Sequence, residues 1–128
     1  MPIKVLLVDD DETFRAVTAI ALESEGCEVR EAASGWAALE ALQSASPDVI
    51  VSDLDMPGLD GAELCRRVRA IPSLANIQFV LLSALIEPDG SGSPVAHEAD
   101  CCLSKQTHFS KLYLQIESLT LLAHQSLQ

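Results

Sequence analysis

The stretch Asp48-Val49-Ile50-Val51-Ser52-Asp53-Leu54-Asp55-Met56-Pro57-Gly58 decides how this chain folds. Residues 48–52 are mostly β-branched and apolar, which predicts a short buried strand. Asp53 ends that run, and the turn-forming residues Pro57 and Gly58 follow closely, so Asp53 should lie at the carboxyl end of the strand. Parallel sheets place their ligand sites outside the carboxyl ends of their strands. Asp53 is therefore the first candidate site residue.

A second acidic group, Asp9-Asp10-Asp11, follows another apolar run at residues 3–8. Because the carboxyl ends of parallel strands meet at one edge of a sheet, this group and Asp53 should form one carboxylate pocket. Two carboxylates about 4 Å apart repel each other by about 4 kcal/mol at an effective dielectric constant of about 20. Such a pocket favours a hard cation, and Mg²⁺ prefers few carboxylates combined with water and phosphate oxygens. Either Asp11 or Glu12 is also expected to cap the helix that follows.

The composition is typical of a globular protein. At 128 residues, with 48% hydrophobic and 21% charged residues, the chain is interpreted as a single domain over residues 1–128. The formal net charge of −11 argues against nucleic acid or an anionic membrane as a direct partner. No apolar stretch reaches the length of about 20 residues that spans a bilayer, and no signal-peptide core follows Met1. A cytoplasmic location is therefore expected.

The four cysteines, Cys27, Cys65, Cys101 and Cys102, lack the paired C-x-x-C spacing of a zinc site. We interpret them as reduced thiols, in agreement with the expected cytoplasmic location. Cys101 and Cys102 are adjacent in a short predicted strand, so their side chains should point to opposite faces of the sheet. Their expected role is packing rather than redox chemistry.

Strand and helix patterns alternate along the chain. The predicted strands cover residues 3–8, 27–31, 48–52, 77–82 and 101–103. The predicted helices cover residues 13–25, a segment capped by Ser34, a segment preceded by Asp60, and residues 109–124. Alternation with short connections predicts an α/β fold, in which a five-stranded parallel sheet is covered by helices on both faces. The inner face of the first helix is expected to contain Phe14, Val17, Ala21 and Leu22.

One connection departs from this alternation. Residues 87–94, Glu-Pro-Asp-Gly-Ser-Gly-Ser-Pro, stand where a helix should join the fourth and fifth strands, and prolines and glycines are unfavourable inside a helix. We therefore expect a degraded fourth helix, with no more than a turn or two at residues 95–99. Residues 87–93 are predicted to be the most mobile internal segment. The face that this connection forms with the fifth strand and the last helix is not expected to support tight dimers.

Polar residues also follow the last two predicted strands. Ser83 ends the fourth and Lys105 comes after the fifth. Each has an ordinary interpretation alone, but an acid pair, an acid, a hydroxyl and a lysine in this order form a far more specific set. With them the chain resembles, over essentially its whole length, the receiver domain of bacterial two-component response regulators of the chemotaxis type, which has a doubly wound, flavodoxin-like fold. The motifs are Val8-Asp9-Asp10, Ser52-Asp53-Leu54-Asp55-Met56-Pro57-Gly58, Leu82-Ser83-Ala84 and Leu103-Ser104-Lys105.

The resemblance implies a role for each site residue. Asp53 would be the phosphoryl acceptor, Ser83 would hydrogen-bond the phosphoryl group, and Lys105 would pair with it. The residues that would bind Mg²⁺ are Asp9, Asp10, Asp53 and, through its backbone carbonyl, Asp55. The implied function is phosphorelay signalling, in which a sensor histidine kinase or phosphotransfer protein donates the phosphoryl group. The domain would then shift its conformation to control an output domain or effector protein, and it would not be a classical enzyme.

The sequence departs from the family pattern near Lys105. The proline that usually follows the lysine in a cis bond is Gln106 here. Because a cis bond before Gln would cost about 3 kcal/mol, we expect a trans bond and a somewhat displaced Lys105. The family usually has an aromatic residue three positions before the lysine, and Cys102 stands there instead. Switching through an aromatic residue at this position is therefore not expected.

The sequence also has features of two other classes of protein. A pseudo-receiver, which acts as an interaction module without phosphorylation, is favoured by Cys102, Gln106 and the interrupted fourth helix, but opposed by the complete acceptor set. A phosphatase of the haloacid-dehalogenase type would use Asp53-Leu54-Asp55 as its D-x-D nucleophile motif. That family places the motif on its first strand and its acidic metal ligands later, whereas here the acid pair comes first and no cap domain is available.

Overall fold

The computed structural model of this protein describes residues 2–86 and 98–126, with side chains as far as Ala123. The strands are β1 (Lys4–Val8), β2 (Glu28–Ala32), β3 (Val49–Asp53), β4 (Gln78–Ser83) and β5 (Cys101–Ser104). The helices are α1 (Glu12–Ser24), α2 (Gly35–Leu42), α3 (Gly61–Ala70) and α4 (Phe109–Ser126). The predicted alternation of strands and helices is confirmed in this part of the chain.

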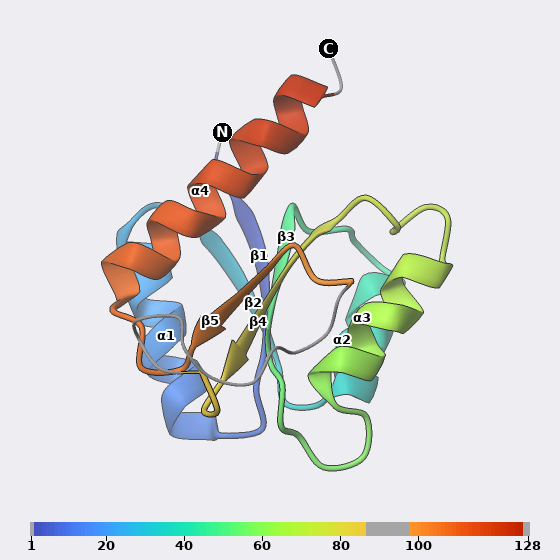
Figure 1. The fold of residues 1–128 in the computed structure, drawn as a ribbon, viewed down its shortest axis with the longest axis horizontal. Coiled ribbons are helices and arrows are strands. Elements are labelled where there is room, and N and C mark those ends of the chain that lie inside the picture. Colours follow the sequence, from blue (N-terminus) through green and yellow to red (C-terminus); the bar gives the residue numbers. More distant parts are fainter. Residues whose placement is uncertain (1, 87–97, 127–128) are drawn as a thin grey trace.

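All five strands are parallel and form one sheet in the order β2-β1-β3-β4-β5 (Figure 1). Since the strands run the same way, their carboxyl ends lie together at the lower edge of the molecule in Figure 1. β1 and β4 flank β3, and the register pairs Val8 with Ser52 and Asp53 with Leu82. This register places the residues that follow β1 beside the end of β3.

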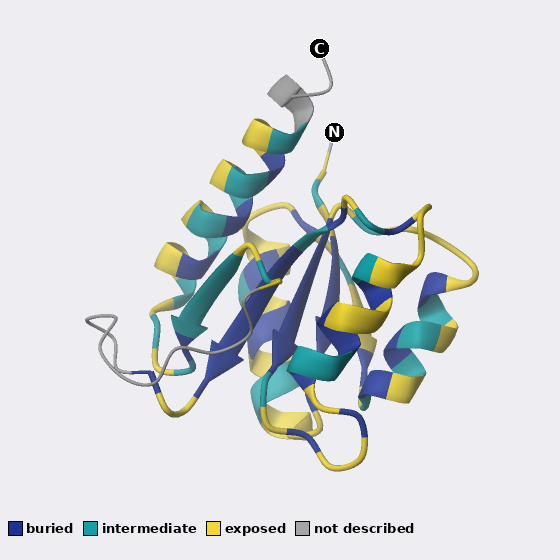
Figure 2. Ribbon diagram, turned by 45° about the vertical axis from the view of Figure 1, so that its right-hand side comes forward, coloured by how far each residue is buried: buried dark blue, intermediate teal, exposed yellow. Residues whose placement is uncertain are grey.

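Two of the described helices cover each face of the sheet. α1 and α4 lie on one side and α2 and α3 on the other (Figure 1). Within β3, Val49 and Val51 pack into the core under α1 and α4, whereas Ile50 packs into the core under α2 and α3. Figure 2 shows the central strands buried along their length between these layers. Cys101 and Cys102 pack against opposite cores, as predicted.

The first three helices begin at side chains that accept a hydrogen bond from the first turn. Asp11 accepts from the N–H of Phe14 at 3.0 Å, so Asp11 rather than Glu12 caps α1. Ser34 and Asp60 cap α2 and α3 in the same way, as their positions in the sequence predicted.

One prediction for α1 is wrong. Val17 is 46% exposed, whereas Thr18, Ala19 and Leu22 are buried. The inner face of α1 is therefore rotated from the face that the apolar residues alone indicated. Thr18 can lie inside because its hydroxyl donates to the carbonyl of Phe14 at 2.7 Å, which satisfies the buried polar group.

Gly61 brings α3 into close contact with the end of β3. A Cβ atom at this position would collide with the backbone carbonyl of Asp53 and the side chain of Leu81. The N–H of Gly61 also donates to the carbonyl of Leu54 at 2.9 Å. The connection between β3 and α3 contains Gly58 at a φ of 78°, a conformation that favours glycine. This turn fixes Asp53 at the edge of the sheet.

The degraded fourth helix and the mobility predicted for residues 87–93 lie outside the described residues, as does most of the turn predicted at residues 95–99. Both therefore stay predictions.

Candidate functional site

Three aspartates form a cluster at the carboxyl edge of the sheet. Asp9 follows β1 directly and Asp53 ends β3, so the pairing of these two strands brings them together. One carboxylate oxygen from each of Asp9, Asp10 and Asp53 lies within 4.8 Å of the others. Asp9 is 1% exposed and Asp53 is 5% exposed, whereas Asp10 is open to solvent. The arrangement offers a cation two buried ligands and one accessible ligand.

The contacts of Asp9 fit a metal ligand. Its Oδ1 atom accepts a hydrogen bond from the N–H of Asp11 at 2.9 Å. Its Oδ2 atom is buried without a well-directed hydrogen bond from the described residues, although Lys105 Nζ lies 3.2 Å away as an ion-pair partner. A buried carboxylate oxygen with spare acceptor capacity, beside two other carboxylates, is suited to a divalent cation. The residues present therefore fit Mg²⁺.

Lys105 reaches this cluster from the end of β5. Its Nζ atom lies 3.2 Å from Asp9 Oδ2 and 3.3 Å from Asp53 Oδ2. The bond to Gln106 is trans, as predicted. The N–H of Lys105 donates to the Ser83 carbonyl at 3.0 Å, and its long side chain spans the remaining gap. The displacement of Lys105 relative to the family's usual lysine position stays a prediction. Burial lowers the pKa of Lys105, but Asp53 and Asp9 outweigh that effect and raise the pKa above its usual value.

The environment of Asp53 opposes its negative charge. Burial raises its pKa and the nearby charge of Asp9 raises it further. The ammonium of Lys105 and the backbone N–H of Asp55 lower the pKa, but the net result is a value of about 6. One lysine therefore does not neutralise the cluster, and an additional cation would lower the free energy of the ionised site.

The other two predicted site residues, Ser83 and Asp55, lie at the ends of β4 and β3, but no ion pair among the described residues joins them to the acidic cluster. Ser83 ends β4 and is buried, and its hydroxyl oxygen accepts a hydrogen bond from the N–H of Leu85 at 3.0 Å. Asp55 is exposed just beyond β3. The structure thus brings Asp9, Asp10, Asp53 and Lys105 together, while the contacts of Ser83 and of the Asp55 carbonyl with a ligand stay predictions.

Two site residues were not identified from the sequence. Arg15 donates to the carbonyl of Asp9 at 2.7 Å and pairs with Glu31 at 3.0 Å, which holds the end of β1. The ring of Phe14 lies under Lys105, with Nζ 4.5 Å from the ring centroid. The only signal for either residue was its place in the first turns of the helix that follows the acid pair.

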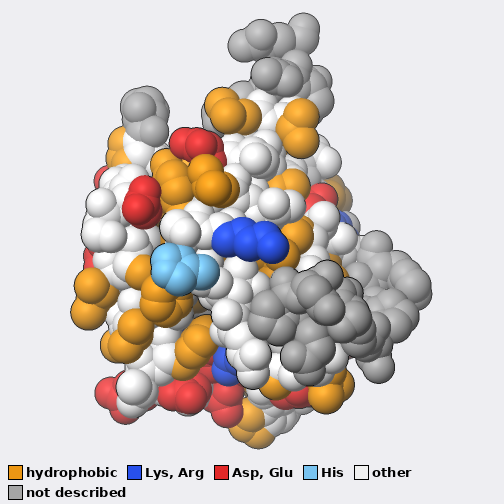
Figure 3. Space-filling view, turned by 60° about the vertical axis from the view of Figure 1, so that its left-hand side comes forward, with side chains coloured by type: hydrophobic (Ala, Val, Ile, Leu, Met, Phe, Trp, Pro, Cys, Tyr) orange, Lys and Arg blue, Asp and Glu red, His pale blue; other side chains and the backbone are white. Residues whose placement is uncertain are grey.

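The surface around the site is acidic, whereas the face formed by α1 and α4 carries exposed apolar side chains. Figure 3 views the molecule from the side of α1 and α4, where acidic side chains gather along the lower edge and hydrophobic ones form patches higher up. The exposed large apolar residues described in these two helices are Val17, Ile20, Leu114, Leu121 and Leu122. None of the described helices is both long enough and apolar enough to cross a membrane.

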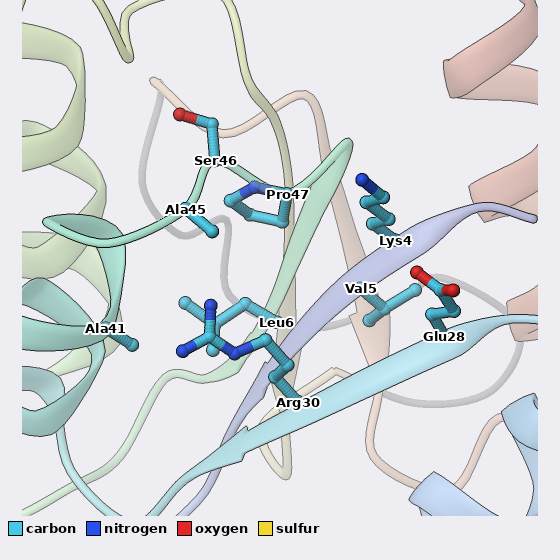
Figure 4. Close-up of a pocket in the computed structure, with 9 residues that line it drawn as sticks. All are labelled: Lys4, Val5, Leu6, Glu28, Arg30, Ala41, Ala45, Ser46 and Pro47. Carbon is cyan, nitrogen blue, oxygen red and sulfur yellow. The ribbon is translucent and has the colours of Figure 1, made fainter.

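A small cavity of about 60 Å³ lies at the opposite edge of the sheet (Figure 4). It lies between the starts of β1 and β2, at Lys4 and Glu28, and the connection that contains Pro47. The cavity is about the size of two water molecules and its lining is largely apolar. It is separate from the acidic cluster, which lies at the strand ends.

Residues 5–117 match the family model of the response regulator receiver domain. The chain belongs to this family. It is 36% identical over 103 residues to a gliding motility regulatory protein of Myxococcus xanthus, covering 80% of this chain and 13% of that protein. It is 40% identical over 80 residues to the transcriptional regulatory protein CseB of Streptomyces avermitilis, covering 62% of this chain and 33% of that protein. The structure of the chemotaxis protein CheY4 of Vibrio cholerae is similar with a TM-score of 0.81 at 29% identity, covering 93% of this chain and 99% of that chain.

The predicted family and the flavodoxin-like receiver fold are thus confirmed. The chain is a response regulator receiver domain of two-component signalling, and receiver domains are signal transducers rather than classical enzymes. Receiver domains bind Mg²⁺ at their acidic pocket and interact with histidine kinases and output domains. The chain spans no more than about a third of the two curated relatives named above.

Proposed function

We propose that Asp53 accepts a phosphoryl group from a partner histidine kinase or phosphotransfer protein, and that this event controls an output domain or effector protein in the cytoplasm. One observation supports this proposal above the others. The Asp53 carboxylate lies among two further carboxylates and the Lys105 ammonium, at the carboxyl edge of a receiver fold. A site of this kind supplies a nucleophile together with the means to neutralise a phosphoryl group.

In the proposed reaction, a carboxylate oxygen of Asp53 attacks the phosphorus atom of a phosphohistidine. The P–O bond forms as the P–N bond breaks, and the departing imidazole keeps the electron pair and takes a proton from water. Lys105 pairs with the phosphoryl oxygens, and the hydroxyl of Ser83 donates a hydrogen bond to one of them. Because the pKa of Asp53 is about 6, the carboxylate is mainly ionised at pH 7, as a nucleophile must be.

Asp9, Asp10, Asp53 and the backbone carbonyl of Asp55 are the proposed ligands of Mg²⁺. When bound, the ion would supply positive charge to the phosphoryl oxygens in the transition state. The net charge of −11 supports a protein partner rather than nucleic acid as the direct contact of this domain.

The proposal is tested with acetyl phosphate as the donor and Mg²⁺ in excess, followed by intact-mass measurement. The wild-type chain should gain one phosphate and Asp53→Asn should gain none. Asp55→Asn is the matched control, since its side chain is exposed and only its backbone carbonyl has a proposed role. Phosphate retained by Asp53→Asn would overturn the assignment of the acceptor.

The same experiment separates this function from a pseudo-receiver. A wild-type chain that gains no phosphate from acetyl phosphate, and that does not respond to beryllofluoride with Mg²⁺, would be an interaction module that works without phosphorylation. The pairing of Lys105 with both buried aspartates opposes that alternative, because the site retains the charges that phosphoryl transfer requires.

A further inference from the structure

The ammonium of Lys105 has both charged and aromatic neighbours. It lies 3.2 and 3.3 Å from the carboxylates of Asp9 and Asp53. It also lies over the ring of Phe14, whose centroid is 4.5 Å from Nζ. The Lys105 side chain is 20% exposed, so little of this environment is water. A cation over the face of an aromatic ring in such a place is attracted by the ring's quadrupole.

Phe14 is itself fixed in relation to the acid cluster. It lies in the first turn of α1, where its N–H donates to the capping carboxylate of Asp11 at 3.0 Å. The next residue, Arg15, donates to the carbonyl of Asp9 at 2.7 Å. The ring is partly buried against the core beneath α1 and α4. These contacts hold the first turn of α1, and with it the Phe14 ring, beside the acidic cluster.

The Lys105 side chain needs a restraint of its own, because the hydrogen bonds at this position fix the backbone and not the ammonium. The N–H of Lys105 donates to Ser83 and the N–H of Gln106 donates to the hydroxyl of Ser104, each at 3.0 Å. The four-carbon stem beyond these bonds has several rotamers. A ring beside the ammonium lowers the number of positions that it can occupy.

We propose that Phe14 is a positioning residue for phosphoryl transfer, which holds the Lys105 ammonium over the Asp9 and Asp53 carboxylates through a cation–π contact. The inference rests on the proposed function of Asp53. Phe14 does not touch the phosphoryl group; it acts through Lys105. The aromatic ring is the feature that matters, so an aliphatic side chain of similar size does not replace it.

The test uses Phe14→Leu, which keeps apolar bulk, and Phe14→Tyr, which keeps the ring. Rates of phosphate uptake from acetyl phosphate are measured with saturating Mg²⁺, at a temperature where thermal melts show every variant folded. Phe14→Leu should be about 3- to 5-fold slower than wild type, the change that corresponds to a partly exposed cation–π contact. Phe14→Tyr should lie within about 2-fold of wild type.

A matched control is Phe109→Leu, which changes another partly buried phenylalanine at the start of α4 and should leave the rate unchanged. The role of Lys105 is tested by repeating Phe14→Leu in a Lys105→Met background. There the substitution should cause no further loss, because the cation is gone. An equal loss with and without Lys105, or a Tyr variant as slow as the Leu variant, would show that Phe14 acts only through packing.

A spectroscopic measurement tests the contact without any phosphorylation. Ring currents should shift the ε-methylene protons of Lys105 upfield in wild type and in Phe14→Tyr, and the shift should vanish in Phe14→Leu. A shift that is absent from wild type would overturn the inference. The two proposals also fail in different ways. A wild-type chain that takes up no phosphate overturns the proposed function, whereas uptake that is no slower in Phe14→Leu overturns only the role of Phe14.

Discussion

β3 and β5 both end at the acidic site, but they are held in very different ways. All residues of β3 are buried, and the strand pairs with β1 on one side and β4 on the other. β5 pairs with β4 alone among the described strands, and its first three residues are only partly buried. The proposed acceptor, Asp53, thus lies on the rigid centre of the sheet, whereas Lys105 lies at its edge.

This difference suggests that the groups of the site differ in how firmly they are held. The buried core holds Asp9 and Asp53 in place, whereas Lys105 follows a partly exposed edge strand, and the position of its ammonium depends on side-chain contacts such as that with Phe14. Cys102, at the position of the family's usual switch aromatic, packs against the core under α2 and α3 without filling it as a ring would. We therefore expect adjustment on this side to proceed through Ser83 and Lys105 rather than through an aromatic residue.

The largest effect that tests this comparison is a difference in packing energy. Ile50→Ala in β3 should lower the free energy of unfolding by about 3 to 4 kcal/mol, because Ile50 is fully buried and its loss leaves a cavity. Leu103→Ala in β5 should cost about 1 to 2 kcal/mol, since this side chain is already partly in water. Urea unfolding measures both values, and similar losses would contradict the contrast between the two strands.

The second effect concerns the charge of Asp53. Its pKa is about 6 in the folded protein and close to 3.8 in the unfolded chain, so the unfolded state ionises first as the pH rises. Without Mg²⁺, the wild type should lose stability relative to Asp53→Asn between about pH 4 and pH 6, by at most about 3 kcal/mol. Below about pH 3 the difference between the two should no longer change with pH, because the carboxyl is then neutral in both the folded and the unfolded state.

Thermal or urea unfolding in EDTA across this pH range checks the sign. Glu40→Gln is the control, since it removes an exposed carboxylate of α2 and should change the pH dependence little. If Asp53→Asn is less stable than wild type at pH 7 in EDTA, Lys105 outweighs the burial of Asp53, and the acidic site is less strained than we infer.

The third effect is the response to metal. Mg²⁺ at about a hundredfold excess over Kd should stabilise the wild type by about 2.7 kcal/mol. Asp10→Ala should raise the stability of the metal-free protein by relieving like-charge repulsion, and should abolish the response. Asp11→Ala removes a neighbouring charge and a helix cap but no cluster ligand, so the response should persist. A wild-type melting temperature that is indifferent to millimolar Mg²⁺ would count against the whole site.

The smallest expected effect is that of removing the Ser83 hydroxyl at the end of β4. Ser83→Ala should slow phosphate uptake by about 5- to 10-fold, the equivalent of about one hydrogen bond of 1 kcal/mol or slightly more. Ser104→Ala is a close control, because both hydroxyls are buried at a strand end and accept from the N–H two residues later at 3.0 Å. Equal slowing by both variants would show that only the local turn matters.

The sequence by itself determined the order of the elements and most of the acidic site. Short-range features were sufficient for this: the apolar runs of the strands, the caps Ser34 and Asp60, and the aspartates placed just after two strands. These signals depend on a few neighbouring residues, and a parallel sheet then brings its strand ends together without further information. Asp9, Asp10, Asp53 and Lys105 were predicted for that reason. The structure places one carboxylate oxygen of each aspartate within 4.8 Å of the others, and Lys105 pairs with Asp9 and Asp53.

Only the tertiary structure decided how these groups are held. Phe14 meets Lys105, and Arg69 of α3 pairs with Asp100 before β5 at 2.7 Å, between segments far apart in the chain. The exposure of Val17 and the bond from Leu85 to the hydroxyl of Ser83 were likewise not evident from the sequence. Such contacts depend on how helices rotate against the sheet and which rotamers the packed core allows. Periodicity and capping constrain a single element, whereas these choices arise from packing many elements at once.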